Sequence, residues 1–280
     1  VKKELWSAPY STFSRWQDVK VLLAVSGGID SMCMADLYYR KQFSCNMAIA
    51  HCNFRLRGDE SDADEAMVSR WAQDRGICLH VRSFDTVSYA ERNGLSIEMA
   101  ARELRYKWFA QLCKEHGYTY VAVAHHADDN AETLFLNLVR GTGMKGISGM
   151  KEISLVPYTS ERAPFRLVRP MLGFTRKQIE GYVHGRMVPF REDRTNSSVE
   201  YRRNSIRHEV FPVLKRMNPS FVGTINREMR YFAEAEDIVS RWCDAAAQSV
   251  VRNDGAAEFV IDTARLLADR HWRYLLYHLL

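Results

Sequence analysis

Residues 21–31 read Val-Leu-Leu-Ala-Val-Ser-Gly-Gly-Ile-Asp-Ser, an apolar run that leads into a glycine turn. The run Val21–Val25 predicts a fully buried strand, and the pattern from Met32 onward predicts a helix. Gly27 and Gly28 lack a Cβ, so the turn can adopt backbone angles closed to other residues, and an anion can approach its peptide N–H groups. Together with the positive N-terminal end of the helix, these N–H groups predict a phosphate-binding turn.

The spacing of this turn excludes a P-loop, because the G-x-x-x-x-G-K-[ST] pattern and its lysine are missing. An ordinary strand–turn–helix junction, in which Asp30 only caps the helix, is the simpler alternative. The two glycines between Ser26 and Asp30 favour phosphate binding.

Length and composition are those of a globular chain with one large domain, or one domain and a smaller partner. Of the 280 residues, 46% are hydrophobic and 26% are charged. No apolar stretch approaches the roughly 18 residues that a membrane span requires, and the N-terminus has no signal-peptide pattern. The six cysteines form no C-x-x-C pair, which argues against a disulfide framework or a zinc site and fits reduced thiols. We therefore expect a cytoplasmic protein without a membrane partner.

Basic residues are concentrated between Arg162 and Arg216, although the net charge of the whole chain is only +5. Such an excess predicts a face for polyphosphate or nucleic acid. A solvated basic surface is an equally open interpretation of the charge alone.

Apolar strand patterns alternate with helical patterns over the first half of the chain. This alternation predicts an α/β fold, a Rossmann-like parallel sheet with helices on both faces. The predicted strands are Val21–Val25, Met47–Ala50, Cys78–Phe84 and Tyr120–Ala124, and the predicted helices are Ser31–Arg40, Ser61–Arg75, Ile97–His116 and Asp128–Arg140. Two further short strands, Phe165–Met171 and Met187–Phe190, are expected to flank a helix that Thr175 caps.

The second half of the chain becomes mainly helical. A helix from about Val199 to Leu214 should be kinked or interrupted by Pro212. We place a domain boundary after Met217, with a catalytic domain at 1–217 and a smaller, mainly helical domain at 218–280. The last residues, 272–280, form an apolar helical face that must be buried. A second copy of the chain, forming a homodimer, or missing downstream sequence is expected to cover it.

Three polar clusters follow predicted strands: Ser26–Ser31, His51–Asn53 and His125–Asp129. The carboxyl ends of parallel strands lie at one edge of a sheet, where ligands bind in such folds. The three clusters are therefore predicted to form one site.

Longer motifs extend this pattern from about Lys20 to Pro219. They resemble, in order, the motifs of tRNA(Ile)-lysidine synthetase, a family of the PP-loop (N-type) ATP pyrophosphatase superfamily with the adenine nucleotide alpha hydrolase-like fold. The S-G-G-x-D-S turn alone indicates only the superfamily, whereas H-H-A-D-D-N-A-E-T followed by R-G-T-G is far more specific. The motifs are His51–Asp62, Glu98–Tyr106, Ala124–Thr133 with Arg140–Gly143, and Glu192–Asn196 with Tyr201–Arg207.

The resemblance implies an ATP-dependent ligase that acts on the wobble cytidine of a tRNA(Ile) with a CAU anticodon. ATP adenylates the C2 oxygen of the cytidine and releases pyrophosphate, and the amine of free L-lysine then attacks C2 and expels AMP. ATP and Mg²⁺ are the implied cofactors, and tRNA(Ile) and free L-lysine are the implied partners.

The ATP-binding and catalytic residues follow from these motifs. Backbone N–H groups of the turn and its two serine hydroxyls suit the leaving pyrophosphate. Mg²⁺ prefers hard oxygen ligands, which points to the carboxylates of Asp30 and Asp129. Asp30, Asp129 and Arg203 are the predicted catalytic residues. The predicted ATP-binding set is Ser26, Gly27, Gly28, Ile29, Asp30, Ser31, His51, Asn53 and His125. His126 is left unassigned, because it equally fits a hydrogen-bonded core residue.

A second group of residues is predicted to hold lysine and RNA. Asp129 and Glu132 share a helix face and could bind the ammonium of lysine, while Arg105 could bind its carboxylate. Arg102, Arg203 and Arg207 are the predicted phosphate or tRNA contacts, since a planar guanidinium suits phosphate. Surface ion pairs and a solvated face are the alternatives for these residues.

The chain departs from the family pattern in two places. Phe54 stands where the family commonly has a second histidine, and the further C-terminal domain of many members is not present in these 280 residues.

Two other functions compete with lysidine synthesis: a 2-thiocytidine-type tRNA thiolase, which needs paired cysteines, and a non-catalytic nucleotide- or RNA-binding protein. Dependence of AMP release on lysine separates the three.

Overall fold

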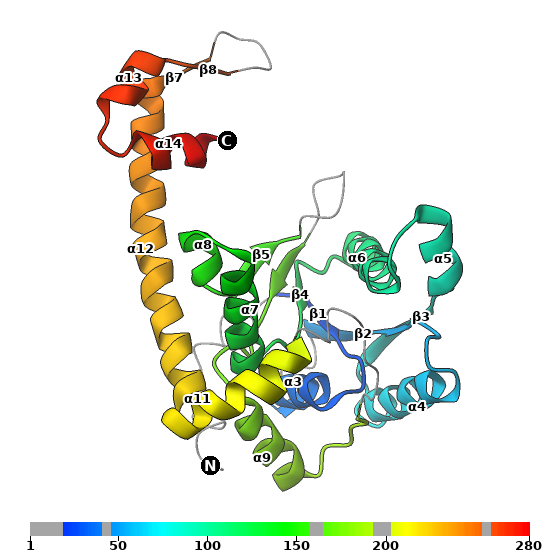
Figure 1. Cartoon of the computed structure of the whole chain (residues 1–280). Helices are drawn as coiled ribbons and strands as arrows, with labels where there is room; N and C mark the ends of the chain where they lie inside the picture. The colour runs from blue at the N-terminus through cyan, green and yellow to red at the C-terminus, as the bar shows by residue number, and fades with distance from the viewer. Residues whose placement is uncertain (1–18, 41–45, 157–164, 193–202, 254–258) are drawn as a thin grey trace. The chain divides into compact units, whose positions relative to one another are not determined.

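Strand β1 (Val21–Ala24) lies inside a six-stranded sheet of order β3-β2-β1-β4-β6-β5 (Figure 1). The computed structural model describes residues 19–40, 46–156, 165–192, 203–253 and 259–280. Five strands are parallel, and β5 is antiparallel to β6 at the edge. The other strands are β2 (Met47–Asn53), β3 (Cys78–Ser83), β4 (Tyr120–Ala122), β5 (Ile153–Leu155) and β6 (Arg166–Val168).

Alternating residues of the central strands build two cores, because successive side chains of a strand point to opposite faces. Val21 and Leu23 belong to the core that includes residues of α3, α4 and α9, whereas Leu22 belongs to the core built on α6. All three side chains are almost fully buried. The predicted parallel sheet with helices on both faces is therefore confirmed. The helices of this part are α3 (Ile29–Arg40), α4 (Asp59–Gln73), α5 (Thr86–Asn93), α6 (Ile97–His116), α7 (Ala127–Arg140), α9 (Arg176–Arg186) and α11 (Phe211–Met217).

The structure corrects the expected strand at Met187–Phe190, which is not formed. Met187 ends α9 in the left-handed conformation at φ 52°, and the N–H of Val188 returns to the carbonyl of Val183. The apolar residues that suggested a strand instead pack as a helix C-terminus, with Val188 buried in the core. At the other end of α9, Thr175 and Gln178 form the reciprocal capping pair that the sequence predicts in part.

The helix before Pro212 is interrupted as expected. Residues 206–210 form a π-helical segment, η2 (Ile206–Val210), and Pro212 lies in the first turn of α11. Proline has no N–H to continue the α-helical ladder, which accounts for the π-helical turn before it, while residues 203–217 stay helical throughout. The predicted start of this helix near Val199 lies outside the described residues.

The chain divides into two compact units, Val1–Thr133 with Met150–Gly223, and Leu134–Gly149 with Thr224–Leu280. The assignment of a catalytic role to 1–217 and a tRNA-contacting role to 218–280 stays a prediction. No helix among the described residues is long and apolar enough to span a membrane.

The second unit has a small core of its own on α12 (Phe221–Val250). Its remaining elements are α8 (Met144–Ile147), β7 (Val251–Asn253), β8 (Phe259–Ile261), α13 (Thr263–Ala268) and α14 (Trp272–Leu279). Leu275 is fully buried against residues of α12, and Trp272 and Leu279 pack on the same core. The chain's own helix thus covers these three residues, whereas Tyr277 and Leu280 are exposed. Cover by a partner or by further sequence stays a prediction.

Candidate active site

The site lies where the strand order of the sheet reverses. The chain passes from β1 outward to β2 and β3 and then returns to place β4 beside β1, in parallel register from Val21 opposite Tyr120. Ligands of open α/β sheets bind outside the carboxyl ends of the strands at such a point. The loops that leave β1 and β4 carry Ser26–Ser31 and His125–Asp129, so the structure brings these two predicted clusters together.

Two serine hydroxyls organise the turn after β1. The hydroxyl of Ser31 donates to the carbonyl of Gly28 at 2.9 Å, and the Ser26 and Ser31 oxygens are 3.2 Å apart. The N–H of Gly28 donates to the Ser26 oxygen at 3.3 Å. Ile29 is buried and begins α3. The turn thus holds its peptide groups at the N-terminus of a twelve-residue helix, where an anion is stabilised.

Gly27 is required at its position for two reasons. Its φ of +97° lies in a region that side chains rarely adopt, and a Cβ would meet Met67 at 3.3 Å. The Gly27 carbonyl also accepts the N–H of Arg191 at 3.0 Å, which ties the turn to the segment after α9. Buried Asp64 stabilises this connection, because its carboxylate accepts hydrogen bonds from Nε of Arg191 at 2.7 Å and from Nη2 of Arg57 at 2.6 Å. Arg191, Asp64 and Arg57 were not predicted as site residues.

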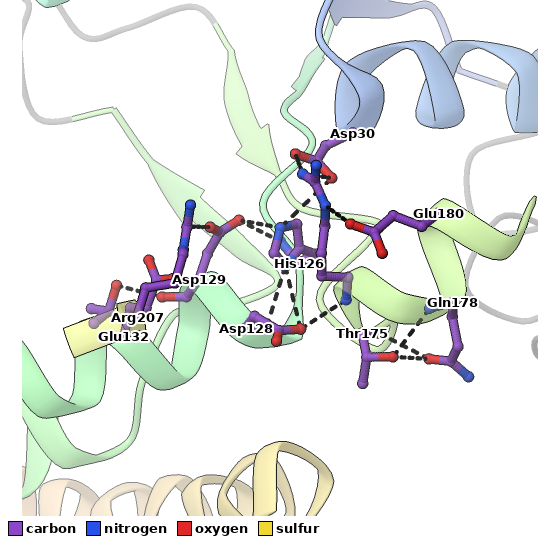
Figure 2. Close-up of polar contacts among 11 residues, drawn as sticks. Asp30, His126, Asp128, Asp129, Glu132, Thr175, Gln178, Glu180 and Arg207 are labelled. Carbon is purple, nitrogen blue, oxygen red and sulfur yellow. Dashed lines mark hydrogen bonds and ion pairs between the residues drawn. The ribbon is translucent and has the colours of Figure 1, made fainter. Parts of the chain in front are cut away.

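Asp30 is paired with an arginine from a distant part of the chain. Arg176, the first residue of α9, contacts both carboxylate oxygens of Asp30 through Nη1, at 3.0 and 2.8 Å (Figure 2). Its Nε donates to Glu180 at 2.9 Å, and its backbone N–H donates to Asp128 at 2.8 Å. Burial raises the pKa of Asp30, and the positive charge of Arg176 opposes that rise. Arg176 and Asp128 were not predicted as site residues.

His126 lies between the two predicted magnesium ligands. Its Nε2 is 3.6 Å from an oxygen of Asp30 and 3.5 Å from an oxygen of Asp129. The same Asp129 oxygen accepts the backbone N–H of His126 at 2.9 Å and so fixes the start of α7. The imidazole is only 3% exposed. The residue left unassigned from sequence therefore contacts both predicted catalytic carboxylates.

Glu132 is a buried carboxylate with one oxygen paired and one oxygen without a partner. Its Oε1 accepts from Nε of Arg207 at 2.7 Å, while its Oε2 is buried without a hydrogen bond (Figure 2). Arg207 also approaches Asp129, at 3.8 Å. Burial raises the pKa of Glu132, and the Arg207 guanidinium opposes that effect. The arrangement can accept a further N–H donor at Glu132.

These groups line one cavity of about 900 Å³. Asp30, Asp129 and Glu132 contribute carboxylates, and Arg176 and Arg207 contribute guanidinium groups. A cavity of this size holds a small ligand. The remaining polar and apolar walls are His126, Asp128, Thr175, Lys177, Gln178, Glu180, Phe211, Lys215, Pro219, Ser220, Val222 and Gly223.

The residues predicted to follow the second strand, His51–Asn53, are instead the last residues of β2, and they lie outside this cavity lining. Other predicted residues outside the lining are Ser26, Gly27, Gly28, Ile29, Ser31, His125 and Arg203. His51 is buried and donates from Nδ1 to the carbonyl of Val25 at 2.9 Å, which leaves its Nε2 as an acceptor. Asn53 donates to both Asp62 and Glu65 at 2.9 Å. The Asn53 side chain therefore anchors β2 to α4 in this structure.

Arg102 and Arg105, predicted for phosphate and lysine, lie over aromatic rings. The Arg105 guanidinium is 5.1 Å from the ring centroid of Phe54, and that of Arg102 is 5.0 Å from Tyr106. Phe54 itself stacks on Phe84 at 5.5 Å. The residue that replaces the family's second histidine thus supports Arg105 through its ring face.

Two arginines, the predicted Arg203 and the unpredicted Arg169, lie close enough to His125 to affect its charge. Burial lowers the pKa of His125 to about 4, and the positive charges of Arg169 and Arg203 contribute to that lowering. His125 Nδ1, Arg169 Nε and Arg203 Nε are all buried without hydrogen-bond partners. Arg169 anchors β5 through the Lys151 carbonyl at 2.8 Å. Its place in a basic stretch was visible in the sequence, but its proximity to His125 was not.

The oxygen donors of the site show whether these residues suit a magnesium ion. No group of three His, Cys, Asp or Glu side chains in the described parts of the chain is arranged to hold a metal ion. Asp30 and Asp129 nevertheless supply two hard oxygen donors that approach the same imidazole nitrogen. Mg²⁺ is commonly bound by one or two carboxylates together with substrate phosphates and water. These two residues fit a magnesium ion carried by a nucleotide.

Comparison with known proteins gives the family. Residues 7–214 match the PP-loop domain family. The tRNA(Ile)-lysidine synthase of Porphyromonas gingivalis is 49% identical over 210 residues, which are 75% of this chain and 44% of that protein. The enzyme of the same name from Chlorobaculum tepidum is 42% identical over 222 residues, 78% of this chain and 64% of that protein. The chain thus spans about half the length of the curated relatives it matches.

A solved structure shows the same fold. The U34-tRNA thiolase NcsA from Methanococcus maripaludis superposes with a TM-score of 0.65 at 17% identity, covering 83% of this chain and 78% of that one. At this identity the likeness concerns the fold alone. The parallel sheet carries the S-G-G-x-D-S turn at the point where its strand order reverses, as the matched family leads one to expect. The chain belongs to the PP-loop family of ATP-using proteins.

Proposed function

We propose that this chain is the catalytic part of a tRNA(Ile)-lysidine synthase, which joins free L-lysine to C2 of the wobble cytidine of a CAU anticodon. One observation carries the proposal: Asp30, from the phosphate-binding turn, and Glu132, a buried carboxylate with an unpaired oxygen, line the same cavity. The first suits an ATP–magnesium complex and the second suits an ammonium group. The resemblance to curated tRNA(Ile)-lysidine synthases supports this substrate pair.

The first step is adenylation of the RNA. The C2 oxygen of cytidine attacks the α-phosphorus of ATP, the α–β phosphoanhydride bond breaks, and pyrophosphate leaves. Peptide N–H groups of Gly27 and Gly28 and the hydroxyls of Ser26 and Ser31 bind the leaving group. Asp30 and Asp129 would hold a magnesium ion, which would supply positive charge to the phosphates of ATP.

The second step transfers lysine. The ammonium of lysine binds Oε2 of Glu132, the oxygen that has no hydrogen bond in this structure, with Asp129 one helical turn away. Because burial raises the pKa of Glu132, this carboxylate is suited to accept the proton that lysine must lose. The free amine then attacks C2, a C–N bond forms, and the C2–O bond breaks to release AMP.

The arginines are assigned to the anionic groups of the substrates. Arg203 and Arg207 contact the α-phosphate or the tRNA backbone, Arg102 contacts the tRNA backbone, and Arg105 contacts the carboxylate of lysine. Residues 1–217 act as the catalytic domain, and residues 218–280 contact tRNA. We place the protein in the cytoplasm, where its tRNA substrate resides, and we propose that it can form a homodimer.

The deciding experiment measures AMP release from ATP and a CAU-anticodon tRNA transcript, with and without free lysine. AMP formed only when both lysine and tRNA are present, with lysine incorporated into the RNA, supports the synthase. AMP release that ignores lysine contradicts it and points to thiolation or to nucleotide sensing. Against thiolation, burial raises the pKa of Cys52, the thiol within the His51–Asn53 cluster, to about 12, so that it stays protonated.

A further inference from the structure

We infer that His126 is a positioning residue that sets the spacing of the Asp30 and Asp129 carboxylates, and so the affinity of the site for a divalent cation. The inference rests on the proposed function only in taking these two carboxylates as the cation ligands. It begins with the observation that one buried imidazole nitrogen approaches both carboxylates.

The hydrogen bonds of the ring determine which nitrogen carries the proton. Nδ1 of His126 accepts the backbone N–H of Asp128 at 3.2 Å. An imidazole nitrogen that accepts a hydrogen bond has no hydrogen of its own, so the hydrogen is on Nε2. Nε2 is the atom that faces the two carboxylates, and it therefore presents a donor to them.

The Nε2–H group of His126 is about equally far from the two carboxylates and is not hydrogen-bonded to one of them alone. The distances from Nε2 to Asp30 Oδ1 and Asp129 Oδ2 are 3.6 and 3.5 Å. Both are longer than an ordinary N–H···O bond of about 2.7–3.2 Å, and they differ by very little. An N–H group at nearly equal distance from two carboxylates reduces their mutual repulsion and can hold both of them close to one point.

His126 also links the elements that carry these groups. Asp30 belongs to α3, Asp129 and Asp128 belong to the first turn of α7, and the Asp128 carboxylate accepts the first N–H of α9 at 2.8 Å. A histidine that only fills space in the core does not need an N–H group facing two cavity-lining carboxylates. Residues that orient metal ligands from outside the ligand set are known to change metal affinity by roughly 10–100-fold.

Two substitutions test the roles of Nδ1 and Nε2 of His126 separately. In His126→Asn the side-chain oxygen can still accept the Asp128 N–H, but the donor toward the carboxylates is lost. In His126→Gln the longer side chain returns an N–H donor to the position of Nε2. Because both variants are polar and similar in size, a purely structural role would affect them alike.

The measurement is the Kd of Mn²⁺ in the presence of a non-hydrolysable ATP analogue, read from the electron paramagnetic resonance of free Mn²⁺. We expect His126→Asn to weaken Mn²⁺ binding by about 10-fold or more, and His126→Gln to restore it to within about 3-fold of the parent. Thermal unfolding checks the fold of each variant. His184→Asn, on the exposed side of α9, is the control and should bind Mn²⁺ as the parent does.

Two results overturn the inference: Mn²⁺ affinity unchanged in folded His126→Asn, or equal losses in the two variants. If His126→Asn does not fold, the Gln variant decides, because weak Mn²⁺ binding by a folded His126→Gln contradicts the positioning role. A parent protein that binds neither the ATP analogue nor Mn²⁺ would instead refute the proposed function.

Discussion

The guanidinium of Arg176 contacts both carboxylate oxygens of Asp30 through a single nitrogen, across 146 residues of sequence. The contact joins the first turn of α9 to the first turn of α3, directly after the phosphate-binding turn. Asp30 is thus held by a positive charge at the position where the proposed reaction needs a magnesium ion. If Asp30 held a magnesium ion as proposed, the Arg176 guanidinium would have to release at least one of the two carboxylate oxygens.

The pH dependence of pyrophosphate release tests the contact between Arg176 and Asp30. Burial raises the pKa of Asp30, and the guanidinium opposes that rise. Arg176→Gln removes the opposing charge, so the pKa of Asp30 should rise further and the acid limb of the rate profile should move to higher pH. Arg186→Gln, at the last residue of the same helix, serves as the control. An acid limb that stays in place in Arg176→Gln would show that Asp30 does not govern it.

Asp30 itself is tested by its isosteric amide. Asp30→Asn should reduce pyrophosphate release by more than about 100-fold, because outer partners of metal ligands are already worth roughly 10–100-fold. The side chain keeps its size, so the thermal midpoint should change little. Pyrophosphate release is measured with saturating ATP and tRNA. Parent-like turnover in this variant would remove Asp30 from the catalytic set.

Glu132 is expected to affect the lysine step alone. Glu132→Gln keeps the shape of the side chain but removes the charge that binds an ammonium. The KM for lysine should rise by about 10- to 100-fold, the value of a hydrogen bond to a charged group, while pyrophosphate release stays within about 3-fold. Glu115→Gln, an exposed carboxylate on α6, is the matched control. An unchanged KM for lysine would exclude Glu132 as the ammonium site.

Much of the sheet could be predicted from the sequence, because its signals are local. The run Val21–Val25 is apolar at every position, as a strand buried on both faces requires. Strand β5, at the antiparallel edge, was missed, since its three residues have exposed or half-buried side chains and no apolar run. The short helix α5 was missed for a related reason, because only Thr86 and Ala90 within it are buried.

The site was predicted only as far as its motifs reach. The predicted residues Asp30, Asp129 and Glu132 line one cavity, and each lies in a motif with a recognisable pattern, but their roles stay predictions. Arg176 was not, since its role depends on a contact with a residue 146 positions away that no local pattern encodes. His126 was left out for the opposite reason. Its position in the motif was known, but the choice between a core histidine and one facing two carboxylates required the structure.

The stability of the chain should depend on pH through His125. Burial lowers its folded pKa to about 4, against about 6.5 in an unfolded chain. Between these values the unfolded state binds more protons, so the stabilisation is complete above pH 6.5 and is lost as the pH falls toward 4. The two pKa values differ by an amount worth about 3 kcal/mol. Urea unfolding of the parent and of His125→Gln at several pH values isolates this contribution, and the variant should show a flatter dependence from pH 6.5 to 4. Equal slopes in the two proteins would mean that His125 is protonated in the folded chain, and that the buried pair Arg169 and Arg203 does not exclude its charge.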